Sequence, residues 1–254
     1  MYLYFIKKIM PQKTMNIISL IAVIVLSCSS DDDAIRVKEP EGELLILPLG
    51  DSRVEGARPF FESYRYELWK NLLENNFDVD FTGPETDPAS YPVFMEQTFD
   101  NDHAGIGGDT TSDVLARLDE ALTSSSVAPD VVLLGIGGND LLGGVPVTTI
   151  IANINDIIDK IQTENERTII LLEQIAPGRS DINTPELLNS FSQFNAEILE
   201  TATNQNNNSS TVIAVDMSSN WGDQFMADEV HYNEQGAKEV ADRYFTALDA
   251  LLDP

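Results

Sequence analysis

The sequence is poor in the residues that build several kinds of site. Its 254 residues include one cysteine, Cys28, and two histidines, His103 and His231. A single cysteine excludes a disulfide within the chain and a zinc site built from cysteines. Any mechanism that depends on a histidine must therefore use His103 or His231.

Basic residues are also scarce. Fifteen lysines and arginines stand against 42 acidic residues, so the formal net charge is −27. Lys7, Lys8 and Lys13 are the only charged residues in the first 27 positions, so the rest of the chain carries about −30. Such a surface repels nucleic acid and disfavours anionic lipids and polyuronic substrates, although salt screens the effect beyond ~10 Å. We expect no nucleic-acid partner.

The longest apolar run near the N-terminus, Ile17 to Leu26, is too short to cross a membrane. It follows three lysines, an arrangement typical of a secretory signal peptide. Cys28, directly after Leu26-Ser27, resembles the lipidation site of bacterial lipoproteins. This resemblance implies a signal peptide over residues 1–27 and a lipid anchor on Cys28. A plain secretory signal, or a start codon assigned too early, is the alternative.

A polar segment that begins Ser29-Ser30-Asp31-Asp32-Asp33 follows the cysteine. Its composition predicts a flexible tether over residues 28–42. We therefore expect a protein of the bacterial cell envelope, periplasmic or surface-exposed, that is bound to the membrane through Cys28.

From residue 43 the pattern alternates between strand and helix. Short apolar runs predict strands, and apolar residues at helical spacing predict helices between them. The strands are expected at 44–49, 77–81, 130–136, 167–172 and 211–215, and the helices at 59–75, 110–122, 147–162, 184–203 and 233–252. This alternation predicts one α/β domain over 43–254, with a five-stranded parallel sheet between two layers of helices.

Ser52 directly follows the first predicted strand. The apolar run Leu44–Leu49 stops at Gly50, and Asp51 and Ser52 come next. In an open α/β sheet, ligands bind beyond the carboxyl ends of the strands, which is where a nucleophile would meet a substrate. A serine that only caps a helix is the plain alternative. A hydroxyl is a poor nucleophile until a base takes its proton, so a catalytic Ser52 needs a partner.

The segment Asp228-Glu229-Val230-His231, just before the last predicted helix, offers such a base. An aspartate three residues before a histidine can accept a hydrogen bond from the ring N–H. That bond fixes the tautomer of the imidazole and stabilises its protonated form. Taken alone, Asp-x-x-His is common, and a surface histidine at a helix start is the alternative.

Two glycine-rich segments supply candidate donors for an oxyanion. Gly105-Ile106-Gly107-Gly108-Asp109-Thr110 opens a helix with free backbone N–H groups, and Asn139 follows the most apolar strand with a side-chain amide. Acyl transfer builds negative charge on the carbonyl oxygen, which such donors stabilise. Either segment alone would more often be a turn. Together with Ser52 and the Asp228/His231 pair, they all follow strands and can converge at one edge of the sheet.

In this order, the four segments resemble the conserved blocks of the GDSL (SGNH) hydrolases, from about Leu44 to the closing helix. The resemblance implies a flavodoxin-like fold and no metal or organic cofactor. It implies a triad of Ser52, Asp228 and His231, and an oxyanion hole of the Ser52 N–H, Gly108 and Asn139. Gly108 is preferred to Gly107 because it directly precedes Asp109-Thr110, as the family glycine commonly does.

Two departures from the family pattern concern substrate binding. Arg53-Val54 stands where the family often has Ile-Thr, and we expect Arg53 either to contact the substrate or to point outward. His103 and the segment Tyr64-Arg65-Tyr66-Glu67-Leu68-Trp69 resemble features of the carbohydrate acetylesterase (acetylxylan esterase-like) branch. We expect His103 either to contact the substrate or to be a structural loop residue.

The resemblance favours an extracytoplasmic serine esterase that removes short acyl groups, mostly acetyl, from carbohydrates through an acyl-enzyme on Ser52. The acidic surface fits a neutral acetylated xylan-type substrate better than an anionic lipid. A lipase, lysophospholipase or thioesterase of the same fold is one alternative and would need a long apolar groove. An inactive glycan-binding surface lipoprotein is another, but every catalytic part is present.

Overall fold

The structure, a computed structural model, describes residues 37–38, 42–207 and 209–253. The predicted signal peptide over 1–27 and the predicted lipidation site Cys28 lie outside the described residues. Within the predicted tether, Val37–Lys38 forms strand β1, which pairs in parallel with β9 (Leu252–Asp253). The predicted tether therefore includes a short strand that is fixed to the C-terminal end of the domain.

Seven strands form the central sheet. They are β2 (Leu44–Gly50), β3 (Val79–Phe81), β4 (Glu85–Thr86), β5 (Asp102–Gly105), β6 (Val131–Gly135), β7 (Ile169–Gln174) and β8 (Val212–Asp216). The order across the sheet is β4-β5-β2-β6-β7-β8, and β3 also pairs with β2. All pairs are parallel except β4 with β5.

The difference between five predicted and seven observed strands lies beside β2. Strand β3 pairs with Leu44–Ile46 and β5 pairs with Leu49–Gly50, while β6 takes the other side of β2. Strands β3 and β5 therefore share one position, and five parallel positions remain with β4 added at the edge. The predicted α/β fold with a parallel sheet is confirmed. The prediction missed β5 because its residues, Asp102 to Gly105, form no apolar run.

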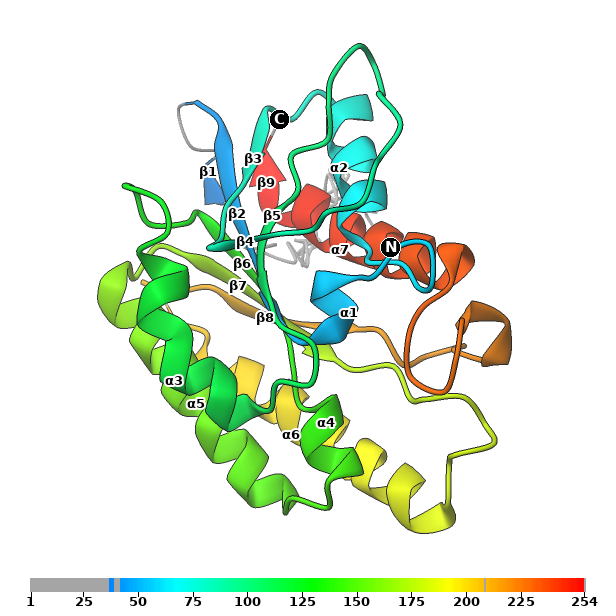
Figure 1. Ribbon diagram of the computed structural model, residues 1–254. Helices are drawn as coiled ribbons and strands as arrows, with labels where there is room; N and C mark the ends of the chain where they lie inside the picture. Colours follow the sequence, from blue (N-terminus) through cyan, green and yellow to red (C-terminus); the bar gives the residue numbers. More distant parts are fainter. Residues whose placement is uncertain (1–36, 39–41, 208, 254) are drawn as a thin grey trace, which may run out of the picture. The chain divides into compact units, whose positions relative to one another are not determined.

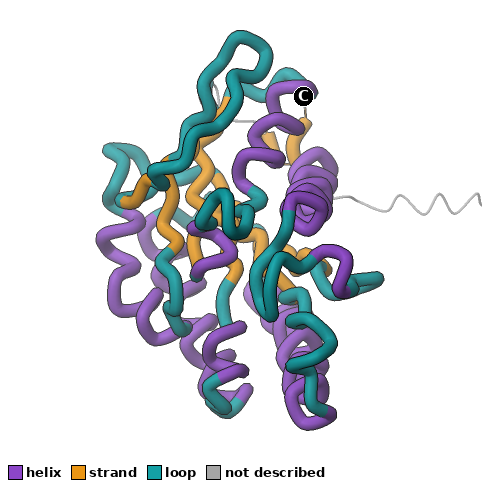
Figure 2. The backbone as a smooth tube through the Cα atoms, turned by 45° about the vertical axis from the view of Figure 1, so that its right-hand side comes forward, coloured by secondary structure: helices purple, strands orange, loops and turns teal. Residues whose placement is uncertain are grey.

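Helices cover both faces of the sheet (Figure 1; Figure 2). Helices α2 (Arg65–Glu74) and α7 (Glu234–Leu251) pack on one face. Helices α3 (Thr111–Leu122), α5 (Val147–Glu164) and α6 (Pro185–Gln205) pack on the other. None of the helices in the described part is long and apolar enough to cross a membrane.

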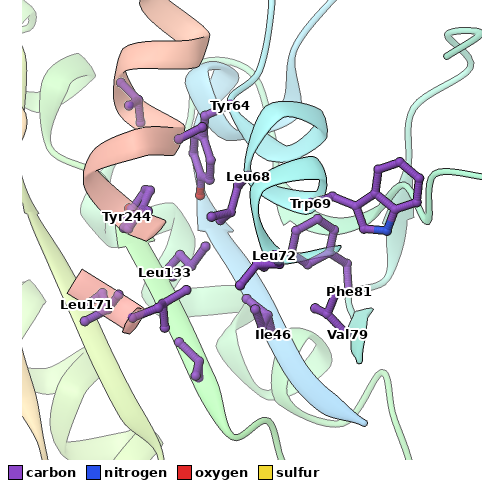
Figure 3. Packing of buried hydrophobic residues seen from close by; sticks show 14 of the residues in the cluster. Ile46, Tyr64, Leu68, Trp69, Leu72, Val79, Phe81, Leu133, Leu171 and Tyr244 are labelled. Atoms are coloured by element: carbon purple, nitrogen blue, oxygen red, sulfur yellow. The ribbon is translucent and has the colours of Figure 1, made fainter. Parts of the chain in front are cut away.

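Side chains alternate along the strands and so feed two separate cores. On the α2/α7 face, Ile46, Leu133 and Leu171 of adjacent strands meet Leu72 and Tyr244 of the helices, all of them buried (Figure 3). Their strand neighbours Leu47, Val132, Leu134, Ile170 and Leu172 belong to the opposite core. Burial on both faces explains why the strands are continuously apolar in sequence.

The remaining helices are short and lie beyond the carboxyl ends of strands. They are α1 (Ser52–Glu55), α4 (Gly138–Leu142) and the 3₁₀ turn η1 (Asp223–Phe225). The helix predicted over 59–75 begins only at Arg65. The preceding residues are held in extended pairs instead, Ala57 with Phe61 and Glu62 with Tyr232. This hairpin is thereby attached to the segment that carries His231.

Candidate active site

Ser52 is the first residue of α1, immediately beyond the end of β2. Asp51 caps this helix, and its side chain accepts a hydrogen bond from the Arg53 N–H at 2.9 Å. Gly50 lies against the Gly135 carbonyl of β6, where a Cβ atom would have no room. Glycine at this position lets two strand ends approach closely and places Ser52 at the edge of the sheet.

Ser52, His231 and Asp228 form a continuous hydrogen-bonded relay. His231 Nε2 lies 2.9 Å from Ser52 Oγ, and His231 Nδ1 lies 2.8 Å from Asp228 Oδ2. The carboxylate accepts a hydrogen bond from the N–H at Nδ1, so Nε2 is the nitrogen that can take the Ser52 proton. The His231 side chain is 19% exposed, which leaves the ring reachable by a substrate.

Asp228 is held as a carboxylate by its local hydrogen bonds. Its Oδ1 accepts from the N–H groups of Val230 at 2.9 Å and His231 at 2.8 Å. Burial acts to raise the pKa of Asp228, but the hydrogen bonds from Val230 and His231 outweigh it and hold that pKa below its usual value. A charged Asp228 can both orient the imidazole and stabilise its protonated form.

Three N–H donors are available beside Ser52. The backbone N–H groups of Ser52 and Gly108 donate to no acceptor in the described part of the chain. The Asn139 amide donates to the Asp109 carbonyl at 2.9 Å, which leaves its second N–H unused. Gly108 has φ +87°, a left-handed conformation that favours glycine. These are the three donors that an oxyanion hole would need.

Two polar side chains, the buried Asp140 and the partly buried Arg117, join the segments that carry these donors. Asp140 follows Asn139 and accepts from both the N–H and the hydroxyl of Thr111, each at 2.9 Å, at the start of α3. Arg117 of α3 pairs with the Asp109 carboxylate at 2.6 Å and donates to the Gly50 carbonyl at 3.0 Å. The positions of the three segments are thereby fixed relative to one another.

A pocket of about 20 Å³ opens beside Ser52. It is lined by Asp51, Ser52, Arg53, Gly138, Asn139, Leu142, Gly178, Ile182, Phe191 and Val230. One water molecule needs roughly 10–15 Å³, so the pocket has room for a group about the size of a methyl. A larger hollow of about 190 Å³ lies near the amino ends of strands β6 and β7, and none of the predicted site residues lines it.

Residues 49–239 match the model of the GDSL-like lipase/acylhydrolase family. The chain belongs to this family. The predicted family and the class of carboxylic ester hydrolase are therefore confirmed. An arylesterase from Vibrio mimicus is 27% identical over 162 residues, which span 63% of this chain and 66% of the relative.

Solved structures of other proteins share the fold. A carbohydrate esterase of family 3 from Talaromyces cellulolyticus superposes with a TM-score of 0.70 at 23% identity, over 81% of this chain and 96% of that chain. A family 3 carbohydrate esterase from Clostridium thermocellum has a TM-score of 0.66 at 26% identity, over 81% and 94% of the two chains. The carbohydrate esterases are thus among the structural neighbours of this chain.

The two predicted substrate contacts have different outcomes. His103 is only 2% exposed, and its Nδ1 accepts from the Gly105 N–H at 3.1 Å within strand β5. Burial, with the nearby Arg65 guanidinium, lowers the pKa of His103 to about 3. The structure thus contradicts a contact between His103 and substrate and favours the structural role, in a strand rather than a loop. Arg53 does line the pocket, so its contact with substrate stays a prediction.

Two residues near the relay were missed by the sequence analysis. The Phe61 ring stacks on the His231 ring, and the Glu55 carboxylate accepts a hydrogen bond from the Gly107 N–H at 2.6 Å. Neither residue stands in a segment that spacing alone marks as catalytic. Among the described residues, no group of three or more His, Cys, Asp or Glu side chains is arranged to hold a metal ion.

Proposed function

We propose that this family member is a serine esterase outside the cytoplasm that removes short acyl groups, mainly acetyl, from carbohydrates. The observation that carries the proposal is the relay from Ser52 through His231 to Asp228 beside a pocket of about 20 Å³. This arrangement brings a nucleophile, a base and a pocket for the acyl group together beyond the carboxyl ends of the parallel strands.

The reaction would proceed through a covalent acyl-enzyme. Ser52 Oγ attacks the ester carbonyl while His231 Nε2 takes the hydroxyl proton. The N–H groups of Ser52, Gly108 and Asn139 donate hydrogen bonds to the carbonyl oxygen and so stabilise the negative charge that develops on it. His231 then returns the proton to the departing alcohol oxygen, and the ester bond breaks. Water, activated by the same imidazole, hydrolyses the acyl-enzyme and regenerates Ser52.

The size of the pocket supports a short acyl group. Leu142, Ile182 and Phe191 are the large apolar side chains among the residues that line it. A lipase or thioesterase with long-chain preference needs an extended apolar groove, and ligand pockets of that kind measure hundreds of Å³. A volume of about 20 Å³ instead suits an acetyl methyl group.

The nature of the alcohol is inferred from the neighbours and from charge. Carbohydrate esterases of family 3 share this fold at a TM-score of 0.66 to 0.70. The net charge of −27 favours a neutral substrate over an anionic lipid. The signal-like segment before Cys28 supports a lipid-anchored location in the cell envelope, where acetylated polysaccharides would be met.

Substrate profiles of the wild type and Ser52→Ala test this proposal. We expect the wild type to release acetate from acetylated xylan and to prefer p-nitrophenyl acetate to the octanoate. We expect Ser52→Ala to lose both activities while its unfolding temperature stays near that of the wild type. A preference for octanoate would favour a lipase or thioesterase. A wild type that binds xylan but fails to react with a fluorophosphonate would favour an inactive binding protein.

A further inference from the structure

We propose that Arg53 and Glu55 are positioning residues, and that the short helix α1 arranges the whole site around the nucleophile it carries. Arg53 holds the segment of the base, and Glu55 holds the segment of the oxyanion donor. The proposal rests on ester hydrolysis at Ser52, and it goes beyond that hydrolysis by assigning roles to two side chains outside the triad and the oxyanion hole.

Arg53 contacts the residues on both sides of the base, the backbone of Val230 and the side chain of Tyr232. Its Nε donates to the Val230 carbonyl at 2.8 Å, and one terminal nitrogen donates to the Ala176 carbonyl at 2.7 Å. Val230 is the residue directly before His231. Tyr232 directly follows His231, and the guanidinium lies over its ring, 4.9 Å from the centroid. Arg53 thus contacts both chain neighbours of the catalytic histidine and limits how far its backbone can move.

Glu55 performs the equivalent task for the oxyanion hole. Its Oε2 accepts from the Gly107 N–H at 2.6 Å. This bond fixes one peptide of a glycine pair whose next N–H belongs to Gly108. The segment is also held on either side of the glycine pair, because the Ile106 N–H donates to the Gly50 carbonyl and Asp109 pairs with Arg117. The Glu55 bond adds a restraint on the two residues between these points, which have no side chains of their own. A hydrogen bond to a carboxylate is shorter and stronger than one between neutral groups, which suits it to restrain the glycine pair.

The helix that carries these side chains is itself anchored. Arg65 is fully buried, and its guanidinium donates to the carbonyls of Val54 at 2.9 Å and Glu55 at 2.8 Å. The same guanidinium pairs with Asp87 at 2.8 Å. Arg65 therefore fixes the last turn of α1. From this helix the Arg53 side chain reaches the segment of the base, and the Glu55 side chain reaches the segment of the oxyanion donor. Ser52 stands one residue before Arg53 and three residues before Glu55 in the chain.

Steady-state kinetics of four variants test the two roles. We expect Glu55→Ala to lower kcat about 10- to 100-fold with little change in KM, because a misplaced donor is felt mainly in the transition state. Glu55→Gln keeps an acceptor for the Gly107 N–H and should recover most of the activity. Arg53→Met should lower kcat by a similar factor, and Arg53→Lys should recover little, because one ammonium cannot reproduce the planar fork.

A proton spectrum separates positioning of the base from a general loss of structure. The His231 Nδ1 proton in its bond to Asp228 should give a downfield resonance in the wild type. We expect this resonance to shift or broaden in Arg53→Met and to stay unchanged in Glu55→Ala. Arg243→Met is the matched control, because Arg243 also donates to two backbone carbonyls, those of Asp216 and Ser219, away from the site.

Several outcomes would overturn the proposal while leaving the proposed function intact. For Arg53, these are an unchanged resonance in Arg53→Met, or a kcat within twofold of the wild type. For Glu55, these are an unchanged kcat in Glu55→Ala, or a loss in Glu55→Gln as large as that in Glu55→Ala. A wild type without any esterase activity would overturn the proposed function itself, and the spectra would still report whether Arg53 restrains His231.

Discussion

The ring of Phe61 stacks on the imidazole of His231, with centroids 3.8 Å apart and planes inclined by 12°. Phe61 lies in the hairpin that pairs with the backbone next to His231, since the Glu62 N–H donates to the Tyr232 carbonyl at 2.9 Å. One face of the catalytic ring is thus covered by an aromatic ring that attracts positive charge. The stack therefore helps to hold the imidazole in its position beside Ser52.

We expect Phe61→Leu to lower kcat about 3- to 10-fold, because such a stack is worth roughly 0.5–1.5 kcal/mol. Phe61→Tyr keeps an aromatic ring and should retain most of the activity. Phe245→Leu is the control, since Phe245 contacts another phenylalanine edge-on, far along α7. Equal rates for wild type and Phe61→Leu would show that the ring only fills space.

Asn139→Ala should lower kcat roughly 100- to 1000-fold while KM changes little, because its free N–H meets the substrate oxygen most strongly in the transition state. Steady-state kinetics on p-nitrophenyl acetate measure both constants. Asn71→Ala, which removes an amide bonded to Asp242 between α2 and α7, serves as the control. An increase confined to KM would instead make Asn139 a residue for ground-state binding.

Leu142→Ala should widen the acyl pocket and shift the preference toward longer esters. Leu142 lines the pocket and is 45% exposed, so its truncation should leave the fold unaffected. One methylene in an apolar pocket changes selectivity about 10-fold or more, so the butyrate-to-acetate ratio of kcat/KM should rise by about that factor. Leu199→Ala, an exposed leucine on α6 that is absent from the pocket wall, should leave the ratio unchanged.

Glu173 makes stability depend on pH. It is buried behind the site, accepts from the Tyr244 hydroxyl at 2.6 Å, and burial raises its pKa to about 7 from an ordinary 4.5. Between these two values the folded state keeps a proton that the unfolded state releases, so the free energy of unfolding falls as pH rises through this window. The loss is on the order of 3 kcal/mol.

Urea unfolding of Glu173→Gln at pH 5 and pH 8 measures this effect. The amide resembles the protonated acid, so the variant should match the wild type at pH 5 and be the more stable of the two at pH 8. Glu200→Gln, on the exposed surface of α6, should follow the wild type at both values. A variant that is less stable than the wild type at pH 8 would mean that the charged carboxylate is favourable in the fold.

The elements that the sequence predicts best are those that bury apolar surface at a regular period. Strand β6 and helix α5 lie within two residues of their predicted ends, because every residue or every third to fourth residue is apolar. Helix α3 begins within one residue of its predicted start, and the structure shows that Thr110 and Asp113 form a capping box there. The parallel order follows from the alternation of these elements.

The elements that were missed depend on contacts between distant segments. Strand β5 exists because its backbone pairs with β2, and α1 and α4 are too short to show a period. The role of His103 was open for the same reason, since its burial follows from the position of β5. At the site, the glycine and triad positions could be predicted because their segments resemble the conserved sequence blocks of the GDSL (SGNH) hydrolases. The contacts of Glu55 and Phe61 could not, because their partners lie 52 and 170 positions further along the chain.

Helix α7 separates the catalytic histidine from the point where strand β1 joins the domain. It starts at Glu234, three residues after His231, and its 18 residues extend ~27 Å to the point where β9 meets β1. The chain therefore enters the domain about one helix length from the catalytic ring. A large substrate that reaches Ser52 therefore approaches the end of α7 that is opposite to the one where β1 joins the domain.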